Sequence, residues 1–127
     1  MKGISIAILI AIVLIVIALT LSGGNTNEPE NANNVTMEGD QQIINLKARG
    51  GYWPKVTTAK ADLPTVIKVI TNNTFDCSSA LVIPSLNWRQ NLPPAGATEI
   101  KVPAQKAGTK LQGLCAMGMY RFDINFI

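Results

Sequence analysis

Sulfur-bearing side chains are concentrated in one short stretch near the C-terminal end of the sequence. Cys115, Met117 and Met119 place one thiol and two thioethers within five residues, with Ala116 and Gly118 between them. In an extended strand every second side chain lies on the same face, so the three sulfurs would share a face. In a turn, the small intervening residues would let the sulfurs converge. Either geometry predicts a cluster of soft donor atoms, which favours Cu(I).

The rest of the composition narrows the choice of metal. The 127 residues contain no histidine and only one other cysteine, Cys77, which lies 38 positions before Cys115. A blue-copper electron-transfer centre normally combines a Cys with two His, and structural zinc usually takes Cys and His. Two thiolates and two thioethers suit Cu(I) better than they suit a blue-copper centre or a structural zinc ion. The candidate metal ligands are therefore Cys77, Cys115, Met117 and Met119.

Two other interpretations of the cysteines stay open on the sequence alone. The two thiols could form a structural disulfide, which an extracytoplasmic location would favour. They could also be unrelated, with the methionines acting as core filler. Neither interpretation explains Met117 and Met119. Their spacing is a poor pattern for core residues, and a disulfide would give the two methionines no role. Catalysis has little support, because the sequence shows no His, nucleophile–base pair or phosphate-binding loop, so we expect neither an enzyme nor a small-molecule substrate.

The N-terminal segment has the composition of a membrane anchor. From Ile4 to Leu21 it runs for 18 residues without a charge, which as a helix would be about 27 Å long and would cross a hydrocarbon core. The segment ends without an A-x-A-like cleavage site, so an uncleaved transmembrane anchor over residues 1–21 is predicted rather than a cleaved signal. Lys2 before the span predicts a single-pass protein of the cell membrane with its soluble domain on the extracytoplasmic side.

The remaining residues divide into two parts of different composition. Residues 22–40 are polar, acidic and rich in Asn and Gly, which predicts a disordered tether. Residues 41–127 alternate short β-branched runs with turn residues, and such spacing predicts an antiparallel sandwich or barrel. The expected strands are Ile43–Lys47, Lys55–Thr58, Thr65–Thr71, Ala80–Ile83, Thr98–Val102, Thr109–Leu114 and Arg121–Ile127.

Charge in residues 41–127 is more positive than in the whole chain. These residues hold ten Lys and Arg but only four acids, giving 10 − 4 = +6, against +3 for the full sequence. A basic domain beside a membrane could rest on anionic headgroups or meet an acidic partner, or the charge could simply keep the surface soluble. Nucleic acid is not an expected partner outside the cell.

Four stretches carry a resemblance to a known family. They are Gly51-Tyr52-Trp53-Pro54, Asp76-Cys77, Leu81-Val82-Ile83-Pro84 and Leu114-Cys115-Ala116-Met117-Gly118-Met119-Tyr120. Together they resemble the cupredoxin-like domains associated with copper-exporting P-type ATPases. With its anchor and tether, the chain is similar to the CupA-type membrane-anchored Cu(I) chaperones of Gram-positive bacteria.

The resemblance implies both a fold and a function. The fold is an all-β, cupredoxin-like Greek-key β-sandwich over residues 41–127, preceded by one N-terminal transmembrane helix. The site would hold two Cu(I) ions, with Cys77 and Cys115 as shared thiolates and Met117 and Met119 completing it. The function would be handover of Cu(I) to a copper-exporting P-type ATPase in copper homeostasis and resistance. The alternatives are an electron-transfer cupredoxin and a disulfide-stabilised extracellular binding module.

Overall fold

The computed structural model describes residues 2–21 and 33–127. Helix α1 (Lys2–Leu21) occupies the segment in which a helix is predicted. The described side chains of this helix, from residue 3 to residue 18, are exposed. Across residues 2–21 and 33–127, no helix has the length and apolarity that a membrane span requires. The anchoring role of the segment therefore stays a prediction.

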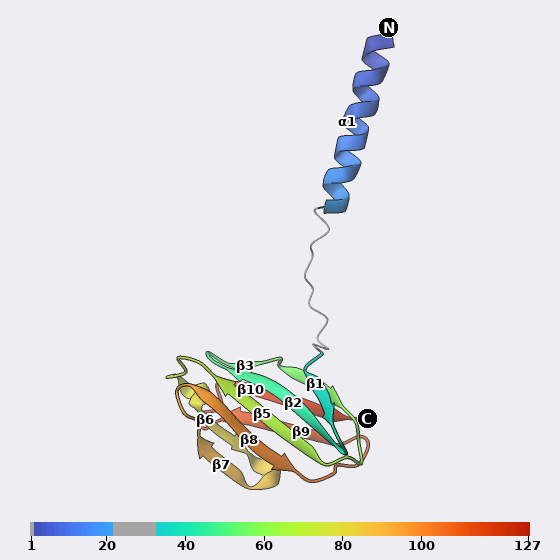
Figure 1. Ribbon diagram of the computed structural model, residues 1–127. Coiled ribbons are helices and arrows are strands. Elements are labelled where there is room, and N and C mark those ends of the chain that lie inside the picture. Colours follow the sequence, from blue (N-terminus) through green and yellow to red (C-terminus); the bar gives the residue numbers. More distant parts are fainter. Residues whose placement is uncertain (1, 22–32) are drawn as a thin grey trace.

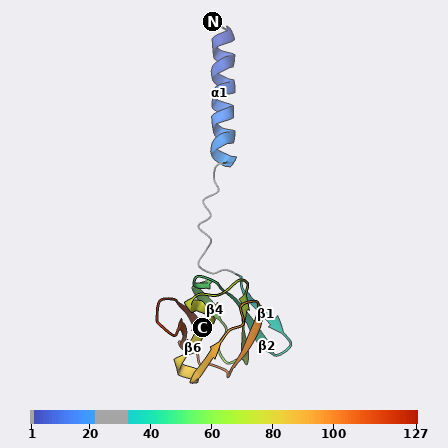
Figure 2. The ribbon, with the colours of Figure 1, turned by 90° about the vertical axis from the view of Figure 1, so that its left-hand side faces the viewer.

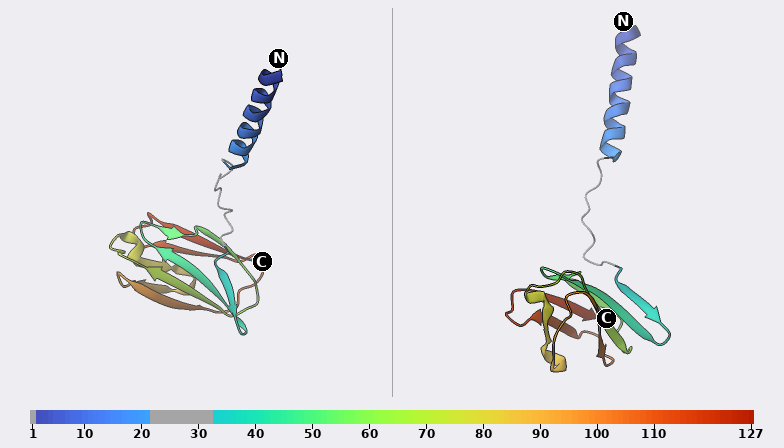
Figure 3. Two further views of the ribbon diagram at one scale, coloured as in Figure 1. Left: turned by 45° about the horizontal axis from the view of Figure 1, so that its top comes forward. Right: turned by 60° about the vertical axis from the view of Figure 1, so that its left-hand side comes forward.

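Ten strands in residues 33–127 form two sheets that stack face to face (Figures 1 and 3). One sheet has the order β1-β2-β5-β8, with β3 added beside β2, and the other has the order β4-β10-β9-β6-β7. Figure 2 shows β1 and β2 on one side of the sandwich and β4 and β6 on the other. The strands are β1 (Val35–Glu38), β2 (Gln41–Ala48), β3 (Tyr52–Trp53), β4 (Val56–Ala59), β5 (Thr65–Thr71), β6 (Ala80–Ile83), β7 (Trp88–Asn91), β8 (Gly96–Val102), β9 (Lys110–Cys115) and β10 (Arg121–Phe126).

The sandwich is mostly but not wholly antiparallel, which corrects part of the prediction. Strand β2 pairs with β5 in parallel, and β4 pairs with β10 in parallel. Both parallel pairs exist because the chain leaves one sheet, contributes to the other and then returns. Strand neighbours that are far apart in sequence are the consequence, as expected of a sandwich with crossover connections.

The core lies between the two sheets and follows the alternation seen in the sequence. Phe122, Ile124 and Phe126 of β10 are all buried, because alternate residues of a strand face the same side. The ring of Phe122 meets that of Tyr52 edge-to-face, with centroids 5.3 Å apart. Strand β5 lies between β2 and β8, and its apolar sequence matches this interior position.

The folded part of the chain begins earlier than predicted. Strand β1 lies within the predicted tether and pairs with β2 from Val35↔Ile44 to Glu38↔Gln41. Asn34 precedes this strand, and its side chain donates hydrogen bonds to the Asn45 carbonyl and the Thr57 hydroxyl. The tether prediction is therefore wrong for residues 35–38. Residues 39 and 40 form the turn between β1 and β2 and also belong to the folded part. The prediction for residues 22–32 lies outside the described residues.

Candidate metal centre

Cys115 is the last residue of strand β9 and is fully buried. It is held from two sides, since it pairs with Leu81 of β6 and its N–H donates to the Tyr120 carbonyl at 2.9 Å. The chain then turns, with the Gly118 N–H donating to the Cys115 carbonyl at 2.8 Å and Gly118 at a φ of 73°. Glycine accepts this left-handed conformation without strain. Of the two geometries that the sequence allows for this stretch, the structure has the turn.

Cys77 reaches the same place from a different segment. It opens a short 3-10 helix, Cys77–Ser79, directly before β6, and it is half-buried against the core. Both cysteines are free thiols, and their side chains hydrogen-bond to each other. The Cys77 sulfur also contacts the backbone N–H of Met117. The structure thus brings together two thiols that lie 38 positions apart in the sequence.

Met117 and Met119 lie in the turn that follows Cys115. Their side chains are 79% and 65% exposed, so neither fills the core. This excludes the core-filler interpretation. Two exposed thioethers that follow Cys115 in the chain offer soft donor atoms at the surface. Their role as ligands stays a prediction, as does that of the two cysteines.

The two thiols differ in acidity because they share a hydrogen bond unequally. Burial raises the pKa of Cys115, but the hydrogen bond from Cys77 and those from the backbone N–H groups of Tyr120, Met119 and Met117 bring its pKa below the usual range. The Tyr120 nitrogen lies 3.4 Å from the Cys115 sulfur. The pKa of Cys77 is raised, mainly because it donates to Cys115. Cys115 therefore loses its proton first, and Cys77 stabilises the resulting thiolate.

Other side chains support this pair, and sequence reasoning assigned them no such role. The Tyr52 hydroxyl donates to the Ser78 carbonyl at 2.9 Å, and burial followed by the nearby Cys115 charge raises the pKa of Tyr52. Asp76 accepts hydrogen bonds from Ser78 and from Gly50. Asp76 and Ser78 directly flank Cys77, and an Asp before a short helix is a recognisable N-cap signal. Tyr52 and Gly50 are far from Cys77 in the sequence, and only the fold brings them to Ser78 and Asp76.

The donor set fits a soft metal better than a hard one. Within residues 2–21 and 33–127, no three His, Cys, Asp or Glu side chains gather into a group that could hold a metal ion. The soft donors next to Cys115 in the sequence are the thioethers of Met117 and Met119. Thiolate and thioether together match Cu(I).

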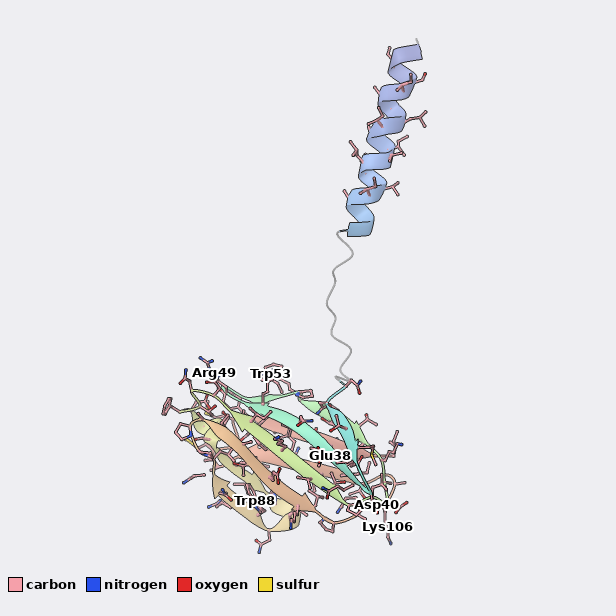
Figure 4. All side chains as sticks on the ribbon, viewed as in Figure 1. Glu38, Asp40, Arg49, Trp53, Trp88 and Lys106 are labelled. Atoms are coloured by element: carbon pink, nitrogen blue, oxygen red, sulfur yellow. The ribbon has the colours of Figure 1, made fainter. Side chains whose placement is uncertain are left out.

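Aromatic side chains and charges of both signs lie on the segments near the thiols, with Asp76 directly before Cys77. Phe75 is 78% exposed and Trp53 is 51% exposed, and the Lys55 ammonium lies 4.9 Å from the centre of the Trp53 ring. Figure 4 shows Arg49 at one end of the sandwich and Asp40 and Lys106 at the other. Because Gly50 bonds to Asp76, the end with Arg49 is the one that carries the thiols.

Comparison with known proteins identifies the fold but not a family. No protein-family model and no curated protein sequence matches the chain. Among solved structures, the metal-binding domain of the Streptococcus pneumoniae D39 Cu(I) exporting P-type ATPase CopA, with Cu(I), is similar at a TM-score of 0.66 and 17% identity, covering 73% of this chain and 92% of that one. A copper binding protein in the apo form is similar at a TM-score of 0.66 and 20% identity, covering 73% and 94%. At such identities the likeness shows a shared fold, and the predicted cupredoxin-like β-sandwich is confirmed to that extent.

Proposed function

We propose that this protein binds Cu(I) through Cys77, Cys115, Met117 and Met119. One observation carries the proposal. Two free thiols from distant segments hydrogen-bond to each other at one end of the sandwich, beside a turn that exposes two thioethers. The similarity of the fold to two copper-binding domains supports it. The same residues would hold two ions if each thiolate bridges both, as the family resemblance implies.

We further propose that the protein is a chaperone that passes its Cu(I) to a copper-exporting P-type ATPase. The thioethers are neutral and exposed, so they can exchange for a partner's ligands while the thiolates keep hold of the ion. One of the structural neighbours is itself a domain of a Cu(I) exporting ATPase. Ligand exchange needs neither an acid–base group nor a cofactor, so the proposed activity is binding and transfer rather than catalysis.

The proposal includes a location at the cell membrane. The uncharged residues Ile4–Leu21 would form a single-pass anchor and would leave the β-sandwich on the extracytoplasmic side. A donor confined to the membrane would meet a membrane-bound exporter by lateral diffusion. Cu(I) is readily oxidised outside the cytoplasm, and burial of Cys115 would help to shield a bound ion from oxidation.

A Cu(I) titration against a competing chelator tests the metal assignment, with the full chain kept in mild detergent. We expect two binding steps, because one ion should depend more on the exposed thioethers and be held more weakly. Replacing Cys77 with Ser, or Cys115 with Ser, should remove the tight step while circular dichroism shows an unchanged fold. Unaltered binding in either variant would refute the site. An intense blue absorption band on adding Cu(II) would instead favour the electron-transfer alternative.

A further inference from the structure

Asp76 makes an unusual number of contacts for an exposed carboxylate beside a candidate metal ligand. One of its oxygens accepts from the Ser78 N–H at 2.9 Å and from the Ser78 hydroxyl, and the other accepts from the Gly50 N–H. It is the N-cap of the short helix that Cys77 opens. One side chain thus joins two loops that are 26 positions apart in sequence.

The residue after Cys77 is fixed at each of its polar groups. Asp76 receives the N–H and hydroxyl of Ser78, while the Tyr52 hydroxyl donates to the Ser78 carbonyl at 2.9 Å. Ser78 is fully buried, so these bonds are shielded from competing water. With its following residue held in this way, Cys77 has little freedom to turn away from Cys115.

The partner thiol is fixed independently. Cys115 is tied to β6 through its pairing with Leu81, and the Ala116 N–H donates to the Ala80 carbonyl at 2.8 Å. The distance between the two sulfurs therefore depends on where the loop at residues 76–79 lies. That loop is linked to the loop at residues 49–51 by the Gly50 bond to Asp76.

We propose that Asp76 is a positioning residue that holds the Cys77 thiol against Cys115 before any metal arrives. The positioning of Cys77 does not depend on the proposed function. Only the use of that position in Cu(I) binding rests on it. Asp76 acts through Ser78 and Gly50, since both of its oxygens are already occupied by donors. A pair of thiols held in place loses less conformational freedom when it binds a metal, which tightens binding.

Two substitutions in the full chain separate the contacts of Asp76. Asp76→Ala removes the cap and the bridge to Gly50. Asp76→Asn keeps one oxygen for Ser78 but turns its amide group toward the Gly50 N–H, so that it loses only the bridge. We expect Asp76→Ala to weaken the tight Cu(I) step about tenfold, the effect of losing a helix cap, and Asp76→Asn to weaken it less. An Asp76→Ala protein that binds Cu(I) as tightly as the wild type would overturn the inference.

Gln42 provides a matched control at a structural position away from the thiols. It is fully buried, and its side chain bonds to the Lys60 backbone and the Thr65 hydroxyl, so Gln42→Ala should also lower stability. If Asp76 acts only by stabilising the fold, Gln42→Ala will weaken Cu(I) binding to the same degree. If Asp76 positions Cys77, Gln42→Ala will lower the melting temperature and leave the Cu(I) affinity unchanged.

A metal-free measurement keeps this inference separate from the proposed function. Dibromobimane becomes fluorescent only when it bridges two nearby thiols, and we expect Asp76→Ala to slow this cross-linking of Cys77 to Cys115 about tenfold. Loss of the Asp76 charge alone would speed it, because that charge raises the pKa of Cys77. If the wild type binds no Cu(I) but cross-linking slows, the proposed function fails and the positioning role stands. An unchanged cross-linking rate refutes the positioning role, whatever happens to copper.

Discussion

Cys115 depends on its backbone surroundings for its chemistry. A fully buried thiol resists ionisation, because burial in an apolar setting disfavours the charged form. Here the turn after the strand directs backbone N–H groups at the sulfur, including that of Tyr120 at 3.4 Å, and the Cys77 thiol adds another donor. These bonds lower the pKa of Cys115 enough to outweigh burial. The turn therefore prepares the thiolate that a soft metal requires.

The two exposed methionines should affect metal binding without affecting the fold. Met117→Leu and Met119→Leu keep the size of the side chain but remove the thioether, and exposed substitutions usually change stability by less than about 0.5 kcal/mol. We expect each to weaken the looser Cu(I) step by about tenfold or more, at the lower end of what disturbing a metal site costs. The measurement is the chelator-competition titration with thermal unfolding in parallel.

Met37→Leu is the matched control for those two variants. Met37 is 49% exposed in β1, which is an edge strand of the sheet that does not contain β6 and β9. The control should bind both Cu(I) ions as the wild type does. If Met37→Leu weakens binding as much as Met119→Leu does, the thioethers of the turn are not ligands.

The core leaves no room for a side chain at Gly113. A Cβ atom added there would lie 2.2 Å from the Phe122 ring, which in turn packs edge-to-face on Tyr52. Gly113→Ala should therefore destabilise the sandwich by about 1–3 kcal/mol, as overpacking of a core does. Urea unfolding measures the change. The double variant Gly113→Ala with Phe122→Leu should recover part of the loss, and purely additive effects would contradict the clash.

At the level of elements, the strands that hydrophobic periodicity predicts are present with boundaries shifted by at most two residues. Strands β5 and β6 match the prediction at both ends. The three strands that the sequence did not reveal are β1, β3 and β7. Strands β1 and β7 contain no buried residue, so burial does not select apolar residues for them, and β3 is only two residues long, of which Tyr52 is buried. Their formation depends on hydrogen bonding to a neighbouring strand, which leaves little trace in a single sequence.

The four candidate sulfur ligands can be proposed from residue type alone, but their arrangement in space could not be predicted. Cys77 meets Cys115 because β6 follows its helix directly and pairs with β9, a long-range register that no local pattern specifies. The choice between strand and turn for residues 116–119 also depended on where β9 ends. Asp76 directly precedes Cys77 in the sequence, but its hydrogen bonds to Gly50 and Ser78 are revealed only by the fold.

Strand β1 is an element whose contribution can be measured through one residue. The side chain of Asn34 connects β2 to Thr57 of β4, so it links the two sheets. Asn34→Ala should cost about 1–2 kcal/mol of unfolding free energy, because it removes two hydrogen bonds at a partly buried place. Urea unfolding followed by circular dichroism measures this. Asn33→Ala, at the exposed neighbour, should have almost no effect, and equal losses would show that the Asn34 side chain does not fasten the sheets together.

At the scale of the whole molecule, charge is distributed unevenly. Residues 41–127 carry the excess of +6, while Glu38 and Asp40 lie just before them and toward the end opposite Arg49 (Figure 4). A positive surface is attracted to anionic lipid even without an anchor. Any measurement of membrane association must therefore separate the effect of this charge from that of helix α1.

Flotation with vesicles of neutral phosphatidylcholine makes that separation. Neutral lipid offers no net charge to the basic sandwich, so only burial of an apolar segment can hold the protein on it. We expect the full chain to float with such vesicles and to resist extraction at high pH and high salt, because 18 uncharged residues are enough to span the hydrocarbon core. A chain that begins at residue 33 should stay in the soluble fraction and should float only when anionic lipid is added at low salt. If the full chain also stays soluble, the anchor is wrong, and Cu(I) transfer would have to occur by free diffusion rather than within the membrane plane.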